Sequence, residues 1–176
     1  GGAGVILKTT GVDVEAMSLR EPACLRIAFS EHLRSGHERE EVPLTKIAII
    51  DLLRQTFDEA LRYEEARLID PDKTPLSRGK ETLVSAMRRE FPVRVSASRS
   101  DDILTAIRLS KEYGFRLMIE YADEAIQVID QLMSVNAGLV CGPLYRGHGY
   151  TAGHSFNFSH AETLLNAGLT VAHMAG

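Results

Sequence analysis

Short apolar runs alternate with longer amphipathic stretches along this sequence. In the first third, apolar runs predict short strands at 5–8 and 23–29, with a brief helical or turn segment at 12–19 between them. The polar stretch 30–41, which a glycine interrupts, predicts a loop. This part of the chain therefore supplies two strands before the first long helix.

Two helices are predicted before residue 92. The first covers about 44–68, and its apolar residues recur at spacings of three and four, which is typical of one buried face. These residues are Ile47, Ile50, Leu53, Phe57, Ala60 and Leu61. After a linker with two prolines, the stretch 79–91 predicts a second helix.

From residue 92 the pattern becomes regular. Strands at 92–97, 115–120, 138–141 and 169–173 alternate with helices at 100–113, 123–133 and 160–166. Ser100 is the expected N-cap of the first of these helices, and Gly114 is its expected end. A long loop rich in Gly, His and aromatic residues follows 138–141.

Strands that alternate with helices predict parallel strands joined by right-handed crossovers. The strands are nearly unbroken apolar runs, so we expect a sheet that is covered on both faces. Two α/β folds fit this order, an open doubly wound sheet and a portion of a (β/α) barrel. The sequence contains no glycine-rich phosphate-binding loop, which disfavours nucleotide binding.

The composition disfavours nucleic-acid binding and a membrane span. The chain has 176 residues, 25% of them charged, and a formal net charge of −4. This balance gives no electrostatic reason to expect nucleic acid, and no apolar run is long enough for a membrane span. Cys24 and Cys141 both lie within apolar runs, so we expect buried free thiols in a reducing cytoplasm.

An ordered set of segments resembles the amidohydrolase superfamily, in particular its imidazolonepropionase-related branch. The segments include EPACLRIAFSEHL, PLTKIAIIDLLRQTFDEALRY, VRVSASRSDDILTAIRLSKEYGFRLMIEYA and LLNAGLTVAHMAG. The resemblance covers nearly the whole chain. It implies a (β/α)8 barrel in which zinc or another divalent metal, held at the carboxyl ends of the strands, activates water to hydrolyse cyclic amide C–N bonds.

The family's metal ligands and catalytic Asp, carried onto this sequence, fall on different residues. The strand-5 histidine falls on Ser96 and the second histidine of the same His-Ala-His motif on Ser98, whereas the strand-6 histidine falls on Tyr121. The remaining aligned positions hold Arg26, where the family has Lys, and Gly176, where it has the catalytic Asp. The strand-1 histidine pair would precede the first residue.

These replacements disfavour metal chemistry. Serine is a weak ligand, Tyr121 binds metal only as a phenolate, and Arg26 cannot be deprotonated. We therefore expect no metal or other cofactor in this chain, and we predict that the family's hydrolase activity is lost. Ser96 has no histidine base nearby in sequence, which disfavours a nucleophilic serine.

Another set of residues suggests ligand binding. Arg26, Arg99, Glu120 and Tyr121 are expected to meet at the mouth of the barrel, where an arginine can hold the carboxylate of a small molecule. The histidines His148, His154 and His160, like His32 and His37, match no metal-ligand spacing and are interpreted as surface residues.

We therefore predict residues 1–176 to be one amidohydrolase-like domain, a partial TIM-type barrel that supplies roughly strands 4 to 8. Because six strands cannot close such a barrel, we expect either missing segments or a second copy to complete it. Two other possibilities remain open, a non-enzymatic binding or assembly domain on the same scaffold and an unrelated flavodoxin-like module.

Overall fold

The structure, a computed structural model, describes residues 2–29, 45–142 and 158–174. Its centre is a six-stranded sheet in which the strands follow one another in chain order from β1 to β6. β1 pairs with β2 in the antiparallel direction, whereas β2 to β6 are all parallel. The strands are β1 (Gly2–Leu7), β2 (Ser18–Ala28), β3 (Val93–Ala97), β4 (Leu117–Tyr121), β5 (Gly138–Cys141) and β6 (Thr170–His173).

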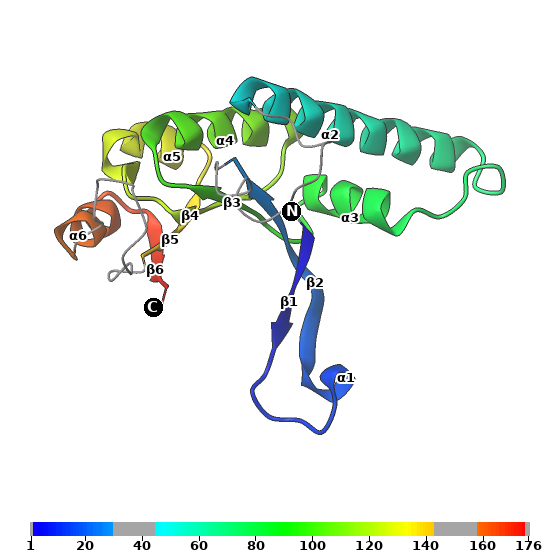
Figure 1. Cartoon of the computed structure of the whole chain (residues 1–176), viewed down its shortest axis with the longest axis horizontal. Helices are drawn as coiled ribbons and strands as arrows, with labels where there is room; N and C mark the ends of the chain where they lie inside the picture. Colours follow the sequence, from blue (N-terminus) through cyan, green and yellow to red (C-terminus); the bar gives the residue numbers. More distant parts are fainter. Residues whose placement is uncertain (1, 30–44, 143–157, 175–176) are drawn as a thin grey trace.

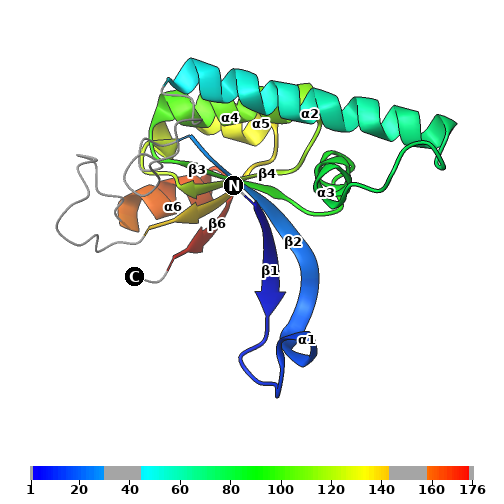
Figure 2. The same ribbon diagram turned by 45° about the vertical axis from the view of Figure 1, so that its right-hand side comes forward.

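Helices connect these strands and gather on one side of the sheet. Figures 1 and 2 show α2, α4 and α5 on the same side, and the β1–β2 hairpin projecting away from them. The helical elements are α1 (Val14–Met17), α2 (Lys46–Ile69), α3 (Arg78–Met87), α4 (Ser100–Tyr113), the short 3-10 helix η2 (Ala125–Gln127), α5 (Ile129–Ser134) and α6 (Phe158–Asn166).

The strand order decides between the two folds that the sequence left open. A doubly wound sheet reverses its order at a switch point and carries helices on both faces. Here the order runs in one direction only, which is the arrangement of a barrel wall. The predicted partial TIM-type barrel fold is therefore confirmed, and the flavodoxin-like alternative is excluded.

The prediction that both faces of the sheet are covered was wrong. Side chains on the helix-facing side are buried, as at Val93, Val95 and Ile119. Side chains of the opposite row are exposed at Arg26 and Ala172. We call this opposite side the open face; in a complete barrel it is the face that lines the interior. The apolar runs did not predict this exposed face, because small and charged residues are interspersed among the apolar ones at its positions.

The helix layer packs through an aromatic cluster. The ring of Phe57 on α2 stacks on Tyr113 of α4, with ring centroids 4.7 Å apart, and on Phe115, with centroids 5.7 Å apart. Phe57, Ala60 and Tyr63 are the buried residues of α2. The predicted apolar face of this helix was therefore partly wrong, because Ile47 and Leu61 are exposed.

The start of α4 also differs from the prediction. Ser100 is the first helical residue rather than the N-cap, and Arg99 occupies the cap position without a side-chain hydrogen bond. The carboxylate of Glu124 caps the helix instead: its Oε2 accepts hydrogen bonds from the backbone N–H of Ser100 at 2.8 Å and from its Oγ at 2.9 Å. Gly114 ends the helix with a φ of 76°, as predicted.

Other boundaries shift by a few residues. The helix predicted at 123–133 is divided into η2 and α5, and β2 extends well beyond the predicted 23–29 because its first half pairs with β1. The loop predicted at 30–41, and most of the loop after β5, lie outside the described residues. Cys24 and Cys141 are buried and free. Within the described ranges, no helix has both the length and the apolar character that a bilayer crossing needs.

Candidate functional site

Glu120 is the centre of a buried polar cluster on the open face. Only 1% of its side chain is exposed. Its Oε2 lies 3.1 Å from a terminal guanidinium nitrogen of Arg26 and accepts a hydrogen bond from Ser96 Oγ at 2.9 Å. Its Oε1 lies 2.5 Å from a terminal nitrogen of Arg94. We call Arg26, Arg94 and Glu120 the ion triad.

Sheet register places these side chains together. In the parallel pairs, Arg26 stands opposite Arg94, and Ser96 stands opposite Glu120. Residues that are opposite each other in neighbouring strands share a face, and residues two apart in one strand share it as well. The long arginine side chains then reach along the strands to the carboxylate.

Sequence reasoning missed Arg94. The run VRVSA has the alternation of a half-buried strand, and its charged residue could have been taken for a solvent-facing position. The available signal was that Arg26, Arg94 and Glu120 each interrupt an apolar strand with a charge. Because a buried carboxylate needs a partner, a lone Glu within FRLMIEYA predicts a nearby cation.

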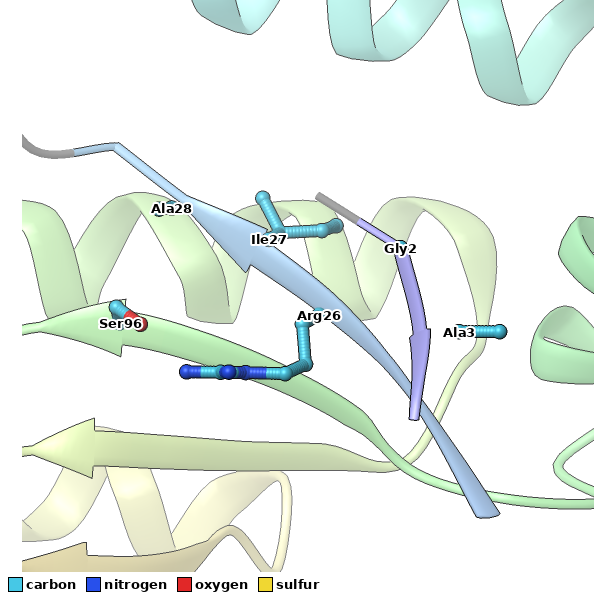
Figure 3. Close-up of a pocket in the computed structure, with 6 residues that line it drawn as sticks. All are labelled: Gly2, Ala3, Arg26, Ile27, Ala28 and Ser96. Carbon is cyan, nitrogen blue, oxygen red and sulfur yellow. The ribbon is translucent and has the colours of Figure 1, made fainter. Parts of the chain in front are cut away.

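An open pocket of about 370 Å³ lies beside the triad. Its lining residues are Gly2, Ala3, Arg26, Ile27, Ala28 and Ser96. Figure 3 shows the Arg26 guanidinium extending along the sheet toward Ser96, whereas Ile27 points to the opposite side of β2. The side chain of Arg26 is 55% exposed, so the pocket opens onto the accessible end of the triad.

Of the four residues predicted to meet at the barrel mouth, Arg26 and Glu120 are in contact. Tyr121 lies in the next row, opposite Ala97 and Cys141. Its φ is 76° and that of Ala122 is 54°, so two consecutive non-glycine residues adopt the left-handed conformation. Such strained positions concentrate at functional sites. This bend at the carboxyl end of β4 had no signal in the sequence.

Arg99 forms an ion pair at the start of α4. Its Nε lies 3.1 Å from Asp101 Oδ1, and 71% of its side chain is exposed. Asp101 also accepts a hydrogen bond from Lys46 of α2 at 2.8 Å. This hydrogen bond from Lys46 is the main cause that holds the pKa of the Asp101 carboxyl below its ordinary value.

Cys141, at the end of β5, is of a residue type that can act as a nucleophile. Burial, followed by the negative charge of Asp123, raises the pKa of its thiol to about 12. The thiol is therefore protonated near neutral pH, and only a thiolate attacks or binds metal. Cys141 is a core residue.

Several predicted residues cannot be placed. Gly176 and the histidines at 32, 37, 148 and 154 lie outside the described residues. Two other predicted residues are described. His160 lies on α6 and is half-buried. Ser98 follows β3, and its backbone C=O accepts a hydrogen bond from the N–H of Glu124 at 2.9 Å.

The described donor set does not fit the divalent metal that the family resemblance implies. No group of three or more His, Cys, Asp or Glu residues among the described positions is arranged to hold a metal. At the aligned positions, Arg26 is a permanent cation and Ser96 is a neutral hydroxyl that donates to Glu120. Because Glu120 is already paired with two arginines, a divalent cation beside it would meet two positive charges.

A solved structure supports the family relationship. The chain is similar to an amidohydrolase from Thermotoga maritima MSB8, with a TM-score of 0.86 and 30% sequence identity. The match covers 99% of this chain and 47% of that structure, so the chain spans about half the length of the protein it matches. No protein-family model and no curated protein matches the chain. The neighbour supports a place in the amidohydrolase superfamily and a fold that is part of the superfamily's barrel.

Proposed function

We propose that residues 1–176 form a degenerate portion of an amidohydrolase barrel, from the imidazolonepropionase-related branch, that supplies roughly strands 4 to 8. In this proposal the chain holds no catalytic divalent metal and does not carry out the family's hydrolysis of cyclic amide C–N bonds. The two buried free thiols support a reducing, cytoplasmic environment.

The ion triad is the observation that carries the proposal. A metal-dependent hydrolase needs neutral or anionic ligands that leave an open coordination position for water. The open face instead carries two arginines around one carboxylate, with Ser96 donating to the same carboxylate. This arrangement satisfies Glu120 internally and leaves net positive charge, which favours an anion over a cation.

A second candidate is a non-enzymatic binding or assembly domain on the same scaffold. The open pocket beside Arg26 favours the binding form of this candidate. The assembly form is favoured by the open face itself, because a second copy or further segments of the protein would cover it.

Hydrolysis assays on the protein at its full natural length test the proposal. The protein is incubated with zinc, manganese or cobalt, and then with small cyclic amides, with and without a chelator. We expect no metal-dependent turnover above that of buffer. Turnover that the chelator abolishes, and that Glu120→Gln removes while Glu112→Gln leaves it unchanged, would contradict the proposal.

A further inference from the structure

We propose that the pocket beside Arg26 binds a small monocarboxylate, with the Arg26 guanidinium as its anchor. This inference rests on the proposed function, because an anion site at this place requires that no divalent metal be held there. It deepens that function by naming the chemical class of the ligand.

Charge at the open face favours one negative charge. Arg26 and Arg94 carry two positive charges, and Glu120 carries one negative charge. The carboxylate is almost fully buried, whereas the Arg26 side chain is 55% exposed. The excess positive charge therefore faces the pocket through Arg26, and none of the residues that line the pocket is acidic.

Arg26 has hydrogen-bonding capacity to spare. A guanidinium has five N–H donors, and the described structure uses a single terminal nitrogen of Arg26, which contacts Glu120 Oε2. The other edge of a guanidinium is a planar fork that matches the two oxygens of a carboxylate. Lysine at this position would offer a point charge without that fork.

The walls of the pocket limit the rest of the ligand. Ala28 presents a short apolar side chain, and Ser96 adds one hydroxyl. A volume of about 370 Å³ is near the lower end of small-molecule pockets. The geometry therefore fits a carboxylate with a short apolar tail, better than a phosphate that carries a second charge.

Titration of the full-length protein with butyrate, followed by calorimetry at constant ionic strength, tests the site. Butyramide is the neutral ligand of the same shape, and phosphate is the competing anion. We expect saturable binding of butyrate and none of butyramide. Arg26→Gln should weaken butyrate binding by on the order of tenfold to a hundredfold, since it removes a charged hydrogen-bonding group.

Arg54→Gln is the matched control, because Arg54 is a partly exposed arginine on α2 whose described ion pairs are with Asp51 and Glu112. It should leave butyrate affinity unchanged. Ala28→Leu is the second variant, because it fills the pocket without removing a member of the triad, and it should abolish binding even if Arg26→Gln fails to fold. Equal affinity in wild type and Ala28→Leu, or equal binding of butyramide, would overturn the site.

A chelator separates this inference from the proposed function. Butyrate binding that survives chelation supports both. Binding that is lost on chelation contradicts both, because it requires a bound metal. Absence of butyrate binding in a protein that also lacks metal-dependent hydrolysis overturns the carboxylate site alone.

Discussion

Glu120 and Arg26 are 94 positions apart in the chain, yet their side chains meet at 3.1 Å on the open face of the sheet. Glu120 is buried, whereas the side chain of Arg26 is half-exposed and lines the pocket. Arg26, at the position where the family resemblance places a lysine, is thus one of the cations that pair with the buried carboxylate.

Glu120→Gln should destabilise the fold. The substitution keeps the shape of the side chain but leaves Arg26 and Arg94 without their counter-charge. We expect a loss of about 1–3 kcal/mol in the free energy of unfolding, measured by urea denaturation. Glu112→Gln is the control, because the Glu112–Arg54 pair is about 40% exposed on each side and should change stability by less than about 1 kcal/mol. Equal effects of the two variants would contradict a buried ionic role for Glu120.

Gly4→Ala should disturb the β1–β2 hairpin. A Cβ at Gly4 would lie 2.5 Å from Cys24 Sγ, which is too close for van der Waals contact. We expect a destabilisation of about 1–3 kcal/mol from overpacking, measured by thermal or urea unfolding. The double variant Gly4→Ala/Cys24→Gly should recover part of that loss. A double variant whose loss equals the sum of the single losses would show that the two residues are not in contact.

Glu124→Gln should weaken the start of α4. The carboxylate accepts two hydrogen bonds from Ser100 and stabilises the positive end of the helix dipole. We expect a loss of about 0.5–2 kcal/mol, as for other helix caps, and faster hydrogen exchange of the first amides of α4. Unchanged exchange in that turn would contradict a capping role.

The buried thiol of Cys141 should make stability fall at alkaline pH. Its pKa is raised from 9.0 to about 12 in the folded state by burial. The unfolded chain loses the thiol proton at lower pH than the folded protein does. The contribution of the protonated thiol to the free energy of unfolding is therefore complete below pH 9 and is lost between pH 9 and about 12. Urea midpoints measured from pH 8 to 11 should fall more steeply for wild type than for Cys141→Ala. Parallel curves would contradict the raised pKa.

Much of the fold could be predicted from the sequence because its signals are local. Apolar runs located the strands from β3 to β6 within a few residues, and Gly114 marked the end of α4. The local pattern did not determine the single-direction strand order, since that order depends on which side of each strand the next crossover lies; it was predicted only through the family resemblance. The cap of α4 by Glu124 was missed for a similar reason, because it joins two segments 24 positions apart.

The candidate site was predictable only in part. The sequence identified Arg26, Glu120 and Ser96 individually, and it placed Arg26 and Glu120 together. It missed Arg94, which completes the triad, and it could not show that Ser96 donates to Glu120. These contacts depend on register between strands, which a one-residue shift would reverse.

Metal content tests the central claim most directly. The protein at its full natural length is purified without chelator, dialysed against metal-free buffer and measured by elemental analysis. Our account predicts less than one equivalent per chain of zinc, manganese, iron, cobalt or nickel. The reason is that Arg26 and Arg94 already pair with the carboxylate of Glu120. A stoichiometric divalent metal that is lost in Glu120→Gln but retained in Glu112→Gln would contradict it.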